Sequence, residues 1–104
     1  MLKRKFRLPK ERLRAKKSLN FRDFVLKTSE NNLGLSRFGF VVSKKIDKRA
    51  VARNKAKRFF RAYIEENLEK IKPGYDFLFI LKRIPEKETI IQIKEVFIKE
   101  GYLK

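Results

Sequence analysis

The sequence contains no cysteine and no histidine, and these two absences exclude most protein-based chemistry. Without cysteine, the chain can form neither a disulfide framework nor a thiolate metal site. It also lacks the most common general base and the strongest side-chain nucleophile. The glycines are dispersed, so no glycine-rich loop is available to cradle phosphate groups. We therefore expect no catalytic residues and no metal site in the protein itself.

Clustered acids and long hydrophobic runs are missing as well. The acids outside the last helices are isolated in the sequence, at Glu11, Asp23, Glu30 and Asp47, so they offer no carboxylate cluster for a metal-dependent nuclease. Asp76 lies inside an apolar segment, where a structural role is more common than ligation. No apolar segment approaches the roughly 18 residues of a membrane span, and the basic N-terminus lacks the apolar stretch of a signal peptide. These absences predict a cytoplasmic protein without a membrane partner.

Negative charge is scarce in the first part of the chain. The 104 residues carry a net charge of +17. Residues 1–61 contain 21 Lys or Arg and four acids, whereas residues 62–104 contain eight of each, so the whole excess lies in the first 61 residues. This asymmetry indicates a surface that binds a polyanion. Ten Phe and three Tyr supply bulky side chains for one core, so a folded domain is expected rather than disorder.

The positive charge is concentrated in residues 48–64, KRAVARNKAKRFFRAYI, which hold seven cations and no acid. At helical spacing this segment has two faces. The side expected to pack on a core holds Ala52, Ala56, Phe59, Phe60 and Tyr63, and a row of cations on its border holds Arg53, Lys57 and Arg61. Like charges at this spacing repel one another, and cations near a helix start oppose the helix dipole. An ordinary solvated face would mix both signs, so a helix that lies against a polyanion is the favoured interpretation.

The rest of the chain predicts strands around this helix. Alternation of apolar and polar residues predicts strands over 21–29 and 37–45, joined by a short loop and therefore expected to pair as an antiparallel hairpin. The core face of these two strands is expected to hold Phe24, Leu26, Phe38, Phe40 and Val42. The basic helix is predicted over 49–68. The apolar segment 75–81 is predicted to be a central strand covered on both faces, so that strand, helix and strand form a βαβ unit.

The two ends of the chain are predicted to differ. Pro85 opens a last helix over residues 86–100, with Ile90, Ile93 and Phe97 on its core face. Residues 1–20 are predicted to be a basic N-terminal arm or to contain a short helix over 10–17, and residues 21–104 a single RNA-binding α/β domain.

RNA is favoured over DNA as the polyanion. Lys and Arg neutralise phosphates of either nucleic acid. A helix-turn-helix DNA reader would place another helix three or four residues before the basic one, but a strand is predicted there. Asn54, within the basic segment, adds a neutral donor and acceptor for a base edge or a 2′-hydroxyl. A basic ribosomal or ribosome-assembly protein without catalytic association is the alternative class.

One family shares this combination of motifs. Val42-Ser43-Lys44-Lys45 is followed by Arg53-Asn54-Lys55-Ala56-Lys57-Arg58, and this pairing resembles the signature of the bacterial ribonuclease P protein subunit, a V-S-K-K strand before an R-N-R-x-K-R helix. Gly74-Tyr75-Asp76 before an apolar strand and the final amphipathic helix also fit. The resemblance covers residues 24–103.

The resemblance implies a fold and a function. The fold is a two-layer α/β (α+β) sandwich with a small mixed sheet, a left-handed βαβ crossover through the basic helix, and a C-terminal helix. The protein would bind the catalytic RNA subunit and the 5′ leader of precursor tRNA, and the RNA, with Mg²⁺, would perform the endonucleolytic 5′ maturation of tRNA. Residues expected to bind RNA are Lys44, Lys45, Arg53, Asn54, Lys55, Lys57, Arg58 and Arg61.

The chain departs from the family pattern at two places. Lys55 replaces the second arginine of the motif, which keeps the charge but loses the bidentate geometry. The N-terminal helix of the family, which supplies aromatic residues to the leader cleft, is shortened or missing before Phe21. With Lys27 where an aromatic residue is common, a leader site would be more electrostatic than stacking. Its expected residues are Val25, Lys27, Ser43 and Lys45, on the sheet face that also holds Val41; an ordinary solvated sheet face is the alternative.

Overall fold

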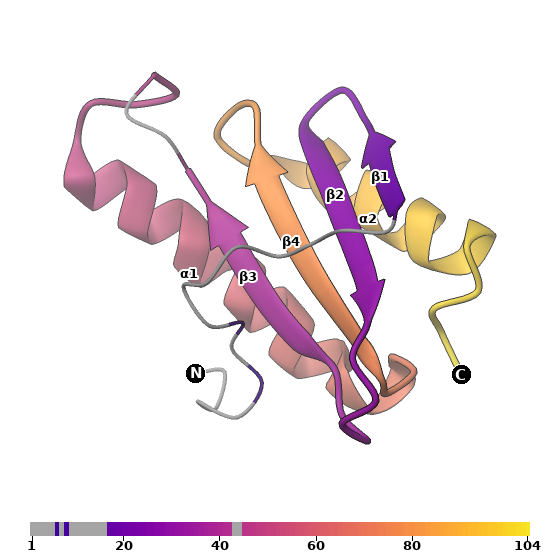
Figure 1. Ribbon diagram of the computed structural model, residues 1–104. Helices are drawn as coiled ribbons and strands as arrows, with labels where there is room; N and C mark the ends of the chain where they lie inside the picture. Colours follow the sequence, from indigo (N-terminus) through magenta and orange to yellow (C-terminus); the bar gives the residue numbers. More distant parts are fainter. Residues whose placement is uncertain (1–5, 7, 9–16, 43–44) are drawn as a thin grey trace.

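A computed structural model describes residues 6, 8, 17–42 and 45–104 of the chain. Figure 1 shows a four-stranded sheet covered on one face by two helices. The elements, in chain order, are β1 (Lys17–Asn20), β2 (Phe24–Glu30), β3 (Arg37–Val41), α1 (Ala50–Asn67), a short 3₁₀ helix (Leu68–Lys70), β4 (Tyr75–Leu81) and α2 (Lys87–Lys99). This two-layer α+β architecture confirms the predicted fold class.

The strands are ordered β1-β2-β4-β3, so β2 and β3 are not neighbours, and the hairpin predicted between the strands over 21–29 and 37–45 is wrong. β4 lies between β2 and β3, antiparallel to β2 and parallel to β3. The six residues between β2 and β3 can span roughly 20 Å, whereas two strand spacings require only about 10 Å. The loop is therefore long enough to pass across β4, which is apolar on both faces and takes the central position.

The basic helix connects two parallel neighbouring strands, β3 and β4. In Figure 1 both arrowheads point the same way, α1 lies behind the sheet, and β4 lies to the right of β3. This arrangement is a left-handed crossover, the reverse of the usual rule for βαβ units. The βαβ unit predicted from the sequence is therefore present.

Strand β1 was not predicted. Its four residues, assigned to the N-terminal arm, pair antiparallel with β2, so that Lys17 lies opposite Thr28 and Asn20 opposite Val25. Residues 17–20 therefore belong to the sheet. The helix predicted over 10–17 lies outside the described residues except at Lys17, which belongs to β1.

The core lies between the sheet and the two helices. Phe60 of α1 and Phe97 of α2 are buried over the same strand residue, with ring centroids 5.9 Å and 6.3 Å from that of Phe79. The predicted core residues of the two strands face this layer: Phe24, Leu26 and Phe38 are buried, as is Val42 directly after β3, and Phe40 is half-buried. The packing fixes α1 on the sheet with one side turned outward.

Candidate nucleic-acid interface

The sheet anchors α1 through three buried side chains, Ala56, Phe60 and Ile64. The prediction that Phe60 is structural is thereby confirmed, and Tyr63 is half-buried beside it. The placement of Phe59 in the core is wrong, because 40% of its surface is exposed. The core face of α1 has two borders. The row of Arg53, Lys57 and Arg61 lies along one border, and Phe59 lies on the other.

The predicted RNA-binding residues divide by exposure. Asn54, Lys55 and Arg58 are exposed on the outer side of α1, and Arg53, Lys57 and Arg61 are half-buried along its border. Lys45 is exposed in the turn that leads to the helix. Lys44 and Ser43 lie outside the described residues. The described cations thus form one continuous surface from the turn along the first three turns of α1, which we name the α1 surface.

Arg53 also shapes the segment before the helix. Its Nη1 donates to the carbonyl oxygens of Asp47 (3.0 Å) and Lys48 (2.9 Å). These carbonyls belong to the chain that enters α1 from β3, so the guanidinium holds the turn that carries Lys45 and Lys48. Sequence reasoning identified Arg53 as a contact residue and missed this positioning role, because the hydrogen bonds depend on how the turn folds back over the first helical turn.

Among the described residues, Asp47 is the acid that lies just before α1 in the chain, and its charge is neutralised locally. Asp47 accepts hydrogen bonds from Arg49 Nε (3.1 Å), Arg49 Nη2 (2.9 Å) and the Arg49 backbone N–H (2.9 Å). The side-chain hydrogen bonds from Arg49, with its backbone N–H, lower the pKa of Asp47 to about 2. The N-cap residue Arg49 supplies no side-chain cap, and its ion pair with Asp47 leaves the remaining cations of the α1 surface without a nearby negative charge from this residue.

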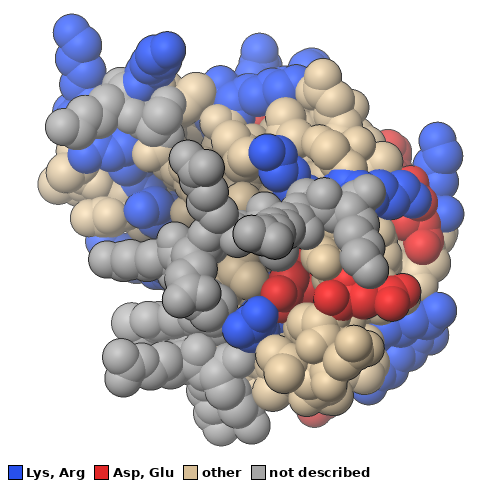
Figure 2. Space-filling view, viewed as in Figure 1, with Lys and Arg blue, Asp and Glu red and all other residues tan. Residues whose placement is uncertain are grey.

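A second group of cations lies at the end of the sheet where β4 ends and β2 begins. Because β3 also ends there, this group lies on the side of the molecule where α1 begins. Arg22 and Arg83 flank the buried carboxylate of Asp23, with Nε–Oδ1 distances of 2.9 Å and 3.5 Å, and more than half of each arginine side chain stays exposed. Lys82 donates to Asn20 Oδ1 and to the carbonyl of Phe21. Figure 2 shows Lys and Arg gathered over the start of α1 and along this upper edge.

The sequence could not reveal this second group. Residues 62–104 are neutral in total, and only the fold brings Lys82 and Arg83 to the edge where α1 begins. Asp23 also receives hydrogen bonds from Thr89 Oγ1 (2.7 Å) and Gln92 Nε2 (2.9 Å) of α2. The hydrogen bond from Arg22, aided by those of Thr89 and Gln92, outweighs burial and lowers the pKa of Asp23.

The sheet face opposite the helices holds the predicted leader residues Val25 and Lys27, both half-buried, and the exposed Val41. The register places Leu78 beside Lys27 and Ile80 beside Val25. Leu78 and Ile80 were missed because β4 was not predicted to pair with β2. Val25, Leu78 and Ile80 therefore form an apolar floor beside Lys27, and the register places the paired Arg37 and Asp76 further along the same face. Of the remaining predicted leader residues, Lys45 lies in the turn beyond β3.

The N-terminal segment contacts this face at one described point. The Leu8 backbone N–H donates to the Phe38 carbonyl at the outer edge of β3 (2.8 Å). A Cβ at Gly39 would lie 3.1 Å from Leu8 Cβ and from Leu78 Cδ1, so the glycine allows Leu8 to lie against the sheet. Leu8 thus borders the floor on the β3 side. Phe21 packs on Phe24 of the core layer, with ring centroids 5.0 Å apart.

Asp76 has the structural role expected for it. Arg37 donates from Nε (2.9 Å) and Nη2 (2.7 Å) to its carboxylate, and Asn31 Nδ2 donates at 2.8 Å. Burial would raise the pKa of Asp76, but the hydrogen bonds from Arg37 and Asn31 outweigh it and keep the pKa low. This network ties the loop after β2 to β3 and β4.

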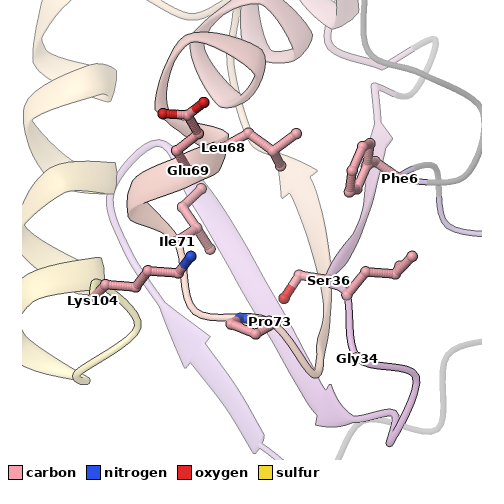
Figure 3. Close-up of a pocket in the computed structure, with 9 residues that line it drawn as sticks. Phe6, Gly34, Ser36, Leu68, Glu69, Ile71, Pro73 and Lys104 are labelled. Carbon is pink, nitrogen blue, oxygen red and sulfur yellow. The ribbon is translucent and has the colours of Figure 1, made fainter.

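A hollow at the other end of α1 does not extend the α1 surface. Figure 3 shows it between Phe6, Leu68 and Ile71, with Glu69 and Lys104 also lining it, and its volume is about 410 Å³. One acid and one cation leave it without net charge. Among residues 6, 8, 17–42 and 45–104, no three acidic side chains gather as a metal site, and no described helix is long and apolar enough to cross a membrane.

Known proteins share this arrangement. A model of the family described as Ribonuclease P matches residues 3–99. The chain is 41% identical to the ribonuclease P protein component of Pelotomaculum thermopropionicum over 80% of its own length and 73% of that protein. It is 47% identical to the component from Fusobacterium nucleatum over 53% of its own length and 49% of that protein. The structure of the Staphylococcus aureus RNase P protein has 31% identity and a TM-score of 0.67, covering 85% of this chain and 84% of that one.

Proposed function

The chain belongs to the ribonuclease P protein family, and from this premise we propose that its α1 surface binds the catalytic RNA of ribonuclease P. As a family member it is the accessory protein subunit of the ribonucleoprotein that matures the 5′ end of tRNA. One observation carries the proposal: the fold holds Asn54, Lys55 and Arg58 outward on a rigid helix whose other side is buried. Each phosphate contact there releases counterions, and a fixed array binds with less ordering of side chains.

We further propose that the 5′ leader of precursor tRNA lies on the open face of the sheet. Val25, Leu78 and Ile80 supply an apolar floor for unstacked bases, and Lys27 supplies a cation for the backbone. Leu8 supports the proposal because it borders this floor at the β3 edge and limits it on that side. A photoreactive nucleotide in the leader should label Lys27 or peptides of β4; labelling confined to α1 would remove this site.

The chemistry is proposed to reside in the RNA. Mg²⁺ would be held mainly by the RNA subunit, and when bound it would supply the Lewis acidity for phosphodiester hydrolysis. The protein supplies cations that favour assembly of two polyanions, the RNA subunit and its substrate. This contribution should matter most at low Mg²⁺, when fewer divalent ions screen the phosphates.

The decisive experiment is cleavage of precursor tRNA by the RNA subunit at low Mg²⁺, with and without this protein. We expect cleavage to rise when the wild-type protein is added, and to rise much less with a Lys55→Gln/Arg58→Gln variant. A Lys94→Gln variant of α2 serves as the control and should act like the wild type. No stimulation by the folded wild-type protein would contradict the proposed function.

A further inference from the structure

The exposed ring of Phe59 lines a hollow within the basic surface. The hollow has a volume of about 370 Å³ and lies between α1 and the segment that follows β4. Its apolar lining comes from Ala52, Ala56, Phe59, Ile84 and Pro85. Ile84, like Phe59, leaves more than a third of its surface exposed. The hollow therefore presents an apolar floor to solvent at a place where the neighbouring side chains are charged.

The Phe59 ring is supported by the buried ring of Phe60. It meets Phe60 edge-on, with centroids 5.9 Å apart and an interplanar angle of 79°, and Phe60 is fully buried. The hollow thus offers a fixed aromatic surface. A flat aromatic side chain within a positive groove is the arrangement that proteins use to stack single-stranded bases, because every base has a π-face.

Charges surround the hollow on both sides. Arg49 and Lys55 lie at its α1 side, and Lys82 and Arg83 directly precede Ile84 on the other. Asp47 also lines the hollow, and its ion pair with Arg49 offsets both charges, so Lys55 supplies the net positive charge of the lining. Lys82 donates to Asn20 and Phe21, and Arg83 lies near Asp23 with more than half of its side chain exposed. A nucleotide whose base enters the hollow would therefore have Lys55 of the lining, and the exposed part of Arg83 beyond Ile84, near its phosphates.

We propose that this hollow binds one unpaired nucleobase of the RNA subunit, stacked on Phe59. The proposal rests on the proposed function, since it names a contact within the same interface. A protein partner or a second copy of the chain could also cover an apolar hollow, but the surrounding cations favour a polyanion. The volume lies within the roughly 300–1,000 Å³ of ordinary ligand sites.

The first test uses Phe59→Leu and Phe59→Ala with the transcribed RNA subunit. Loss of one base stack should weaken binding about 5- to 100-fold in Phe59→Ala, and Phe59→Leu, which keeps apolar contact, should still lose at least about fivefold. Ile98→Ala on the outer side of α2, where Ile98 is exposed, is the matched control and should bind like the wild type. Thermal unfolding of each variant excludes misfolding as the cause.

The second test exploits the absence of tryptophan from the chain. In a Phe59→Trp variant, RNA binding should strongly quench the single indole, whereas the indole of an Ile98→Trp variant should change little. Unchanged affinity in Phe59→Leu together with no quenching in Phe59→Trp would overturn the base site. Self-association of the free protein that Phe59→Ala abolishes would instead assign the hollow to a protein interface, and would also overturn it.

These outcomes are separable from failure of the proposed function. If the wild-type protein does not bind the RNA subunit, the proposed function fails. If it binds, and Lys55→Gln/Arg58→Gln weakens binding while Phe59→Leu does not, only the base site fails.

Discussion

The two helices lie on the same sheet face but place their charges by opposite rules. α2 begins with a capping box between Glu86 and Thr89, has Glu88 in its first turn and Lys99 in its last. α1 has no side-chain cap, no acid in its first turn and no cation in its last turn. The charges of α2 complement its dipole and stabilise the helix, whereas those of α1 oppose it. The contrast supports the proposal that the charges of α1 serve binding rather than the stability of the helix.

The stability of α1 therefore depends on its buried side. Because isolated helices are marginal in water and α1 opposes its own dipole, tertiary packing must hold it. Phe60→Ala should lower the free energy of unfolding by about 3–5 kcal/mol, since it removes a fully buried ring. Chemical denaturation would measure this. Phe97→Ala in α2 is the matched change and should cost a similar amount; a near-neutral Phe60→Ala that had lost RNA affinity would contradict the structural role.

The start of α2 depends on the buried carboxylate of Asp23. Asp23→Asn should destabilise the protein by about 1–3 kcal/mol, because the hydrogen bonds from Thr89 and Gln92 lose their charged acceptor. Asp47→Asn near the start of α1 should cost much less, since its carboxylate is paired with the exposed Arg49. Equal losses in the two variants would contradict the difference between the helix ends.

Acid should remove the contribution of Asp23. Its folded pKa lies below the unfolded value of about 3.9, so the stabilisation is present above that value and is lost as the pH falls through the folded pKa. Unfolding free energies measured from about pH 5 downward should fall less steeply in Asp23→Asn than in the wild type. Parallel profiles would show that Asp23 does not contribute.

A smaller effect distinguishes the two helix starts directly. Ala50→Glu places an acid in the first turn of α1 at an exposed position, and it should stabilise the free protein by about 0.3–1 kcal/mol. The same change should weaken RNA binding, because it brings negative charge to the α1 surface. The reverse substitution in α2, Glu88→Ala, should lower stability slightly and leave RNA binding unchanged.

The sequence predicted most elements because each has a local signal. The period of apolar residues and the Pro and Gly positions indicated both helices and three strands to within a few residues. Strand β1 gave no such signal, because its sequence KSLN has no apolar alternation. The hairpin prediction failed because loop length alone does not decide whether a third strand lies between two others.

The α1 surface was predictable from sequence because its residues are consecutive on one helix. The group of Arg22, Lys82 and Arg83 was not, since the fold assembles it from segments that are distant along the chain. Phe59 was misassigned because it lies on the border of the core face, where helical spacing cannot separate a half-exposed ring from a buried one.

The salt dependence of RNA binding tests the central claim most directly. The claim is that the α1 surface contacts phosphates of the RNA subunit. In a folded Lys55→Gln/Lys57→Gln/Arg58→Gln variant, the slope of log affinity against log salt should become shallower by about 2–3 units. The α2 variant Lys94→Gln should keep the wild-type slope. An unchanged slope in the folded triple variant would contradict the account.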